Sequence, residues 1–281
     1  MDYVNINGKT VPTERARIAV ADRGFRFGDG VFETIALHDG ILYQWELHEQ
    51  RMAEGLAALR IPLPSYDMVK LVRRVIRKNA LRDGFVRISI SRGVGSRGYR
   101  PLPDISPTLV IECMPFGEAK EAATTLWLSR YTKPPTSCFP TQFKTAQGLN
   151  STLAIMEADA QGCGDALLLT HDGQLCEASS GNLFWYQDGA LHTPATSTGC
   201  LRGTTRDAVL RLSPYPIKHQ NTWLDTLQHA ECVFITNCNL GIMPVSALKP
   251  QGWQWKAYHQ VIGELQSLYR LDIKRYVDQH R

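Results

Sequence analysis

Four two-residue turn signals, each flanked by β-favouring residues, constrain the fold of this chain more than any other feature. Pairs of this kind readily adopt the positive backbone φ angles that close tight hairpins, so each one predicts two antiparallel strands. Two of the signals fall in each half of the chain, and the four are Asn7-Gly8, Asp39-Gly40, Asp172-Gly173 and Asp188-Gly189. The sequence therefore predicts strand pairs in both halves.

Helical periodicity separates these strand pairs and points to an α+β chain. Residues 46–60 and 66–80 carry it, and after residue 148 a helix is expected with Leu149, Leu153 and Met156 on one face. A long closing helix follows from the pattern of "KAYHQVIGELQSLYRLDIKRYV". The stretch 115–123, "PFGEAKEAA", interrupts the pattern with proline, glycine and charge. We place the boundary there, with a smaller N-terminal domain over 1–117 and a larger C-terminal domain over 118–281.

Composition excludes several classes of protein. The chain has 281 residues, and its net charge of +4 is too small and too dispersed to indicate nucleic-acid binding. No apolar run is long enough for a membrane span, and the N-terminus lacks the layout of a signal peptide, so a cytoplasmic protein is expected. The seven cysteines form no CxxC pair, which predicts reduced thiols and no metal site.

Two charged residues stand out against apolar or uncharged surroundings. Lys144 is the only charge between Pro134 and Gly148, just before the expected helix. An ordinary surface lysine would also fit this position. Glu177 follows an apolar strand and precedes small residues. Because an unpaired buried charge is costly, it requires either an arginine in the core or the protonated ring nitrogen of a bound cofactor.

Three further stretches could bind an anion, and each has an ordinary structural reading. In "CLRGTTRDAV", Thr204 and Thr205 lie at a helix start, where unpaired N–H groups attract anions; a threonine cap is the alternative. In "FITNCNLG", Asn237 and Cys238 follow a strand and form either a second anion nest or a simple turn. Arg51 lies on a helix, where most arginines cover apolar surface with their stems.

Taken together, a reactive lysine, a carboxylate, two anion nests and an arginine match the requirements of pyridoxal 5′-phosphate. The order of the blocks also resembles one family. From "DRGFRFGDGVFET" through Lys144, "EASSGN" and "LRGTTR" to "TNCN" and "MPV", the chain is similar to the class IV, or fold-type IV, aminotransferases. The resemblance implies a two-domain fold whose larger domain has a β-barrel-like core, a homodimer, and small-molecule substrates.

The resemblance also implies a role for each residue. Lys144 would bind pyridoxal 5′-phosphate covalently and act as the catalytic base, and Glu177 would hold the pyridine nitrogen. The remaining cofactor contacts would come from the phosphate ligands and from an apolar residue on the ring: Arg51, Thr204, Thr205, Asn237, Cys238 and Leu201. The family usually has isoleucine where this chain has Thr204, a departure without effect if the backbone amide makes the contact.

Within the family, the loop "SRGVGSRGYRPLP" most resembles that of the aminodeoxychorismate lyases. Arg97 and Tyr99 in this loop, with Thr34 in "GDGVFET", are the expected substrate contacts. The predicted reaction is elimination of pyruvate from 4-amino-4-deoxychorismate to give 4-aminobenzoate for folate synthesis. The alternative is a D-amino-acid or branched-chain amino-acid aminotransferase, in which Arg97 would hold an α-carboxylate.

Overall fold

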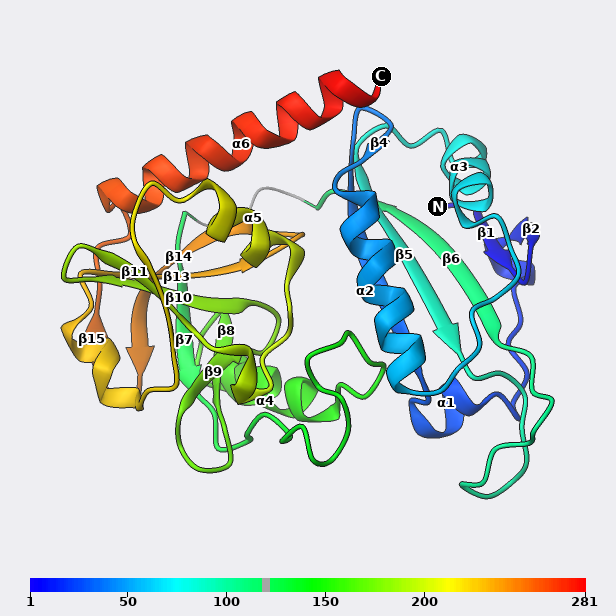
Figure 1. The fold of residues 1–281 in the computed structure, drawn as a ribbon, viewed down its shortest axis with the longest axis horizontal. Helices are drawn as coiled ribbons and strands as arrows, with labels where there is room; N and C mark the ends of the chain where they lie inside the picture. The colour runs from blue at the N-terminus through cyan, green and yellow to red at the C-terminus, as the bar shows by residue number, and fades with distance from the viewer. Residues whose placement is uncertain (118–121) are drawn as a thin grey trace. The chain divides into compact units, whose positions relative to one another are not determined.

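The computed structural model describes residues 1–117 and 122–281, and the chain divides into two compact units (Figure 1). The first unit contains Met1–Gly117, Phe143–Gln147 and Arg275–Arg281, and the second contains residues 118–142 and 148–274. The first unit thus differs from a simple 1–117 domain by two short later segments. The expected boundary at 117/118 borders residues 118–121, which lie outside the described residues.

A sheet whose six described strands are ordered β2-β1-β6-β5-β3-β4 forms the first unit. All its neighbouring strands are antiparallel. Its strands are β1 (Tyr3–Ile6), β2 (Lys9–Pro12), β3 (Gly30–His38), β4 (Ile41–Leu42), β5 (Gly84–Ser91) and β6 (Thr108–Pro115). Its helical elements are η1 (Thr13–Arg15), α1 (Arg23–Phe27), α2 (Trp45–Ala58) and α3 (Met68–Lys78). The turns predicted at Asn7-Gly8 and Asp39-Gly40 are confirmed, since all four residues have positive φ.

The two faces of this sheet differ, and the difference follows from the alternation of the strands. Along β5, Val86, Ile88 and Ile90 are buried in one apolar core with residues of α2 and α3. Successive side chains of a strand point to opposite faces, so Arg87 and its cross-strand neighbour Thr34 lie on the other face, and both are only half-buried.

A closed barrel forms the centre of the second unit. The strand order β10-β13-β14-β7-β8-β9 returns on itself because β9 also pairs with β10, which closes a ring of six among the described strands. The strands are β7 (Thr124–Leu128), β8 (Asp165–Leu169), β9 (Leu175–Ala178), β10 (Asn182–Gln187), β13 (Cys232–Asn237) and β14 (Gly241–Lys249). Outside the ring lie β11 (Ala190–Pro194), β12 (Ile217–Gln220) and β15 (Trp253–Gln254). The predicted α+β architecture with a barrel-like core is confirmed.

Helices accompany this barrel in the second unit. They are α4 (Leu149–Ala160), η2 (Thr196–Thr198), α5 (Thr204–Leu212) and η3 (Leu224–His229), and most of α6 (Gln260–His280) belongs here too. On α4, the buried face consists of the small residues Ala154 and Ala158, whereas Leu149 and Met156 are 71% and 60% exposed. The apolar face predicted for this helix therefore points outward within its unit.

The structure also bears on the state of the cysteines and on membrane-spanning helices. All seven cysteines are free thiols, and five of them are buried. Across residues 1–117 and 122–281, no helix combines the length and apolarity that a membrane crossing requires.

Candidate active site

In the first unit, Lys144 is fixed by the backbone of β3. The segment 143–147 runs beside the start of this strand: Phe32 N–H donates to the Lys144 carbonyl, and Ala146 N–H donates to the Gly30 carbonyl, each at 2.9 Å. Thr145 also forms an isolated bridge with Val31. The Lys144 ammonium lies 4.6 Å from the centre of the Phe32 ring. The predicted reactive lysine is therefore attached to a rigid strand, although it belongs to a loop in sequence.

Arg51 is buried and is held by a carboxylate of β3 that the sequence did not reveal. Its Nε and Nη2 donate to the two oxygens of Glu33 at 2.7 and 2.6 Å, and His48 Nδ1 contacts Glu33 at 2.7 Å. Burial alone would raise the pKa of Glu33, but the Arg51 guanidinium and the His48 hydrogen bond outweigh it and lower that pKa to about 2. Glu33 is therefore an anion that orients Arg51.

His48 completes this buried cluster as a neutral ring. Burial lowers its pKa, and the positive charges of Arg51 and Lys144 lower it further, against the opposing effect of Glu33. A neutral imidazole that faces a carboxylate must donate from the contacting nitrogen, so Nδ1 carries the proton. The cluster thus contains one negative charge and one positive charge, with His48 as an uncharged donor.

A second cation in this unit contacts the same aromatic ring as Lys144. The guanidinium of Arg87 lies 3.9 Å from the centre of the Phe32 ring, so this ring contacts both Arg87 and Lys144. Burial lowers the pKa of Arg87, partly offset by Glu112. The sequence analysis did not single out Arg87, because it occupies a polar position of a half-buried strand, where a solvated arginine is the ordinary interpretation.

Arg97 and Tyr99 lie in an exposed loop, and Tyr99 is 85% exposed. The loop is anchored by Arg23, which donates to the carbonyls of Gly98 and Tyr99 at 3.0 and 2.9 Å. The Tyr99 ring also packs against Phe27 of α1, with ring centres 5.4 Å apart. Within the first unit, these contacts join the loop to α1.

In the second unit, Glu177 is buried at the point where β9 pairs with β10. Its Oε2 accepts from Leu201 N–H at 2.8 Å and more weakly from Asn182 Nδ2 at 3.4 Å. Its Oε1 contacts the ammonium of Lys133. The charged partner expected for this carboxylate is thus a lysine in the structure, whereas the sequence pointed to an arginine or a ligand.

The start of α5 is an uncapped helix end with two buried threonines. Its N-cap is Gly203, which has no side chain to cap the first turn, so the alternative of a threonine cap is wrong. A Cβ at Gly203 would lie 2.1 Å from Asn182 Oδ1, which explains why glycine is needed here. Thr204 and Thr205 are 6% and 3% exposed. A helix end with unpaired N–H groups and buried hydroxyls can bind an anion.

The turn after β13 is stabilised by the side chain of Asn237. The Asn237 side chain accepts from Asn239 and Leu240 N–H at 2.9 and 2.7 Å and donates to the Ser180 carbonyl at 2.8 Å, so it stabilises the turn itself. Next to it, the Thr236 hydroxyl is buried and has no hydrogen-bond partner among the described residues. Thr236 pairs with Asn182 across the sheet and so lies near the point where β9 pairs with β10. A buried hydroxyl without a partner fits a ligand that hydrogen-bonds to it.

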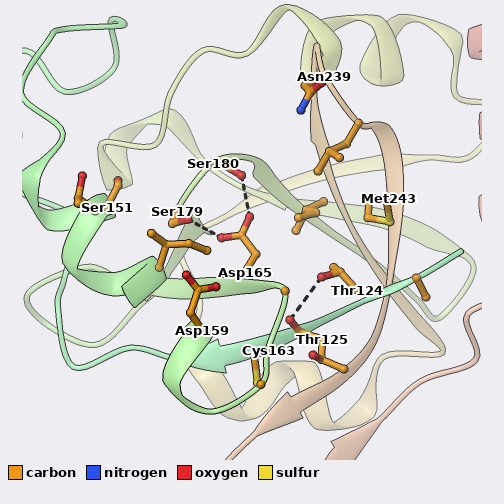
Figure 2. Close-up of a pocket in the computed structure, with 17 residues that line it drawn as sticks. Thr124, Thr125, Ser151, Asp159, Cys163, Asp165, Ser179, Ser180, Asn239 and Met243 are labelled. Carbon is orange, nitrogen blue, oxygen red and sulfur yellow. Dashed lines mark hydrogen bonds between the residues drawn. The ribbon is translucent and has the colours of Figure 1, made fainter. Parts of the chain in front are cut away.

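A cavity of about 970 Å³ also lies in the second unit, but none of the predicted site residues lines it (Figure 2). It borders the site through Ser179 and Ser180 of the loop after Glu177 and through Asn239 and Leu240 of the turn after β13. Both hydroxyls donate to the buried carboxylate of Asp165, at 2.5 and 2.7 Å, as Figure 2 shows. Asp165 therefore fixes the loop that follows Glu177, and the cavity adjoins two loops of the site without containing a predicted cofactor contact.

The predicted residues thus fall into two sets. The first unit holds Arg51, Lys144, Thr34, Arg97 and Tyr99, and the second holds Glu177, Leu201, Thr204, Thr205, Asn237 and Cys238. Cys238 is half-buried in the turn after β13. In the second unit, Leu201 N–H and Asn182 connect Glu177 to the start of α5. The sequence missed Glu33, His48, Arg87 and Lys133, all of which act through contacts distant in the chain.

Comparisons with known proteins place this geometry in a family context. The family model described as amino-transferase class IV matches residues 30–248. A putative branched-chain-amino-acid aminotransferase of Methanocaldococcus jannaschii is 32% identical over 251 residues, which are 86% of each chain. The aminodeoxychorismate lyase of Bacillus subtilis is 25% identical over 288 residues, covering 98% of this chain and 96% of that protein. The crystal structure of the Escherichia coli branched-chain amino acid aminotransferase aligns with a TM-score of 0.89 at 27% identity, over 95% of this chain and 92% of that one.

Proposed function

The chain belongs to the class IV aminotransferase family, and we propose that it is an aminotransferase acting on branched-chain amino acids. The family resemblance predicted from the sequence is confirmed, and with it the cofactor, pyridoxal 5′-phosphate. The observation that carries the substrate proposal is the 32% identity with the Methanocaldococcus jannaschii protein over 86% of both chains. The comparisons thus favour the alternative named in the sequence analysis over the lyase.

The residues of the second unit fit one end of pyridoxal 5′-phosphate. Glu177 would accept the N–H of the pyridine ring, and Leu201 would pack on the ring. The uncapped start of α5, with Thr204 and Thr205, and the turn at Asn237 and Cys238 would bind the phosphate. Because the Asn237 side chain is already used within its turn, we assign its contribution to the backbone. The unpartnered Thr236 hydroxyl supports a polar ligand at this place.

The residues of the first unit would supply the reactive amine and a further phosphate contact. Bound pyridoxal 5′-phosphate supplies an electron-withdrawing ring that stabilises negative charge on the substrate carbon next to nitrogen. Lys144 would take the proton from that carbon, for which its amine must be neutral. Arg51, oriented by Glu33, would bind the phosphate.

Arg87 is our candidate for the substrate carboxylate. It is half-buried, it contacts the Phe32 ring that Lys144 also contacts, and it pairs with Thr34 across the sheet. Guanidinium groups bind carboxylates through two parallel hydrogen bonds, which fixes the orientation of an amino acid. Arg97 and Tyr99 remain candidates for contacts with the rest of the substrate, from their exposed loop.

The activity assay compares branched-chain L-amino acids with D-alanine as amino-group donors. Protein loaded with pyridoxal 5′-phosphate is incubated with L-leucine, L-isoleucine or L-valine and 2-oxoglutarate, and the glutamate formed is measured. Glutamate formation with these substrates, and little with D-alanine, supports the proposal. Turnover of D-alanine alone, or of none of these amino acids, refutes it.

The attachment residue is tested independently of turnover. Borohydride reduction locks a covalent link between the cofactor and a lysine, and fragment mass spectrometry then locates it. We expect the label on Lys144. Lys133 lies eleven positions earlier in the chain and is the internal alternative, so a label there would refute the role given to Lys144.

A second candidate is the 4-amino-4-deoxychorismate lyase reaction. It is supported by the Bacillus subtilis relative, which matches 98% of this chain, and by the loop with Arg97-Gly98-Tyr99. The same protein is incubated with 4-amino-4-deoxychorismate, and 4-aminobenzoate and pyruvate are measured. Release of both products without amino-acid turnover would favour the lyase.

We also propose a homodimer, which the family resemblance implies. The exposed apolar residues Leu149 and Met156 of α4 support it, since exposed apolar patches often mark association surfaces. Light scattering coupled to size exclusion measures the mass in solution. A dimeric mass that becomes monomeric in a Leu149→Asp, Met156→Asp protein is expected, and a monomeric wild-type protein would contradict the proposal.

A further inference from the structure

Lys133 is a half-buried lysine that is absent from the proposed cofactor contacts. Its side chain is only 14% exposed, in the second unit. Its backbone N–H donates to the Leu169 carbonyl at 2.8 Å, which fixes the residue at the end of β8. Its ammonium contacts Oε1 of Glu177, 44 positions later in the chain. A long, flexible side chain is thus held inside the protein by one carboxylate.

Glu177 is the counter-charge of Lys133. Burial lowers the pKa of Lys133, but the Glu177 carboxylate outweighs it, so the pKa is raised and the amine is charged. The two thiols that also influence Lys133 are those of Cys176 and Cys200, and burial raises the pKa of both. These thiols are therefore neutral near pH 7 and supply no negative charge.

The same contacts fix the orientation of the Glu177 carboxylate. One oxygen accepts from the rigid backbone N–H of Leu201 at 2.8 Å, and the other contacts Lys133. Removal of Lys133 would therefore take away the counter-charge of Glu177 and one of the contacts that orient its carboxylate.

We propose that Lys133 is a positioning residue that balances the charge of Glu177 and orients its carboxylate to accept the ring N–H of pyridoxal 5′-phosphate. This inference rests on the proposed function, in which Glu177 binds the ring nitrogen. Lys133 acts from behind the carboxylate, and its effect on the cofactor passes entirely through the ring nitrogen. A cofactor without that nitrogen should not respond to Lys133.

The test therefore compares two cofactors in binding, without any measurement of turnover. The dissociation constants of pyridoxal 5′-phosphate and of its 1-deaza analogue, which has C–H in place of the ring nitrogen, are measured by absorbance titration of the apoprotein. The variants are Lys133→Met, Lys133→Arg as the conservative replacement, and Lys218→Met as a control for the same change at an exposed lysine of the same unit. Circular dichroism checks that each variant is folded.

In Lys133→Met, we expect the preference for pyridoxal 5′-phosphate over the analogue to fall by about tenfold or more, the effect of losing one charged hydrogen bond. Lys133→Arg and Lys218→Met should keep the wild-type preference. If Lys133→Met weakens both cofactors equally, or neither, Lys133 only packs in the core and the inference is wrong. If wild-type protein does not bind pyridoxal 5′-phosphate, the proposed function itself fails.

Discussion

Replacing Glu33 with glutamine tests whether this carboxylate is the buried anion that fixes Arg51. Glu33 is 1% exposed and contacts Arg51 twice and His48 once, within 2.7 Å. Its pKa is lowered from 4.5 to about 2, and each pKa unit corresponds to about 1.4 kcal/mol of interaction with the charged form. The ionised form is therefore stabilised by roughly 3 kcal/mol in the folded state. Since Glu33→Gln also leaves the Arg51 charge buried without its partner, we expect a loss of roughly 3 kcal/mol or more at pH 7.

The stability difference between the wild-type protein and Glu33→Gln should depend on pH in a defined direction. The folded-state pKa of Glu33 lies below the unfolded value, so its contribution is fully present above about pH 4.5 and disappears as the pH falls toward about 2. Glutamine does not titrate in this range. The difference in unfolding free energy between the wild-type protein and Glu33→Gln should therefore be constant from neutral pH to about pH 5 and shrink below it.

The assay is urea unfolding of the apoprotein, followed by far-ultraviolet circular dichroism at a series of pH values from 7 to 3. Glu14→Gln serves as the matched control, because Glu14 is exposed in the short helix η1 and its replacement should change stability by less than about 0.5 kcal/mol. A Glu33→Gln protein within about 0.5 kcal/mol of wild type at pH 7 would refute the reasoning. A large difference that does not shrink on acidification would refute the electrostatic part and leave a packing effect.

Two further predictions concern the proposed site. Arg87→Met should raise the KM for both the amino acid and the keto acid by about tenfold or more, because one charged hydrogen-bonding partner of the carboxylate is lost. The dissociation constant of pyridoxal 5′-phosphate should change little. An equal loss of cofactor affinity would contradict the role given to Arg87. Gly203→Ala should lower the unfolding free energy by about 1–3 kcal/mol and weaken cofactor binding, because the alanine Cβ would lie 2.1 Å from Asn182 Oδ1. Urea unfolding measures the first effect and absorbance titration the second. Unchanged values would contradict the prediction and show that the loop can move aside.

Local sequence signals predicted the elements of this fold well, because turn residues and periodicity act over a few positions. Asn7-Gly8 and Asp39-Gly40 close hairpins, and helices occupy most of 46–60 and 66–80. Closure of the barrel through β9 and β10 depends on pairing among six strands, which no local pattern encodes. The attachment of residues 143–147 to β3 is equally non-local, so the composition of the first unit could not be read from the sequence.

The site was predictable only in part, for the same reason. The residues named from the family resemblance are those expected to touch the cofactor or substrate. Their partners inside the protein were missed, because each pair joins distant positions: Arg51 with Glu33 and Glu177 with Lys133. The burial of Glu177 did predict that a partner exists, since a lone buried carboxylate is costly. Its identity required the fold, because β8 determines where Lys133 lies.

The two ion pairs would present opposite charges to pyridoxal 5′-phosphate. This follows from the opposite charges at the two ends of the cofactor. Its phosphate is an anion, so in the first pair the cation, Arg51, would face the ligand and the carboxylate of Glu33 supports it from behind. Its protonated ring nitrogen is a cation, so in the second pair the carboxylate, Glu177, would face the ligand and Lys133 supports it. In both pairs the supporting residue balances the charge of the contacting group and fixes its orientation. Substituting a supporting residue should therefore weaken one end of the cofactor selectively: Glu33→Gln the grip on the phosphate, and Lys133→Met the grip on the ring nitrogen.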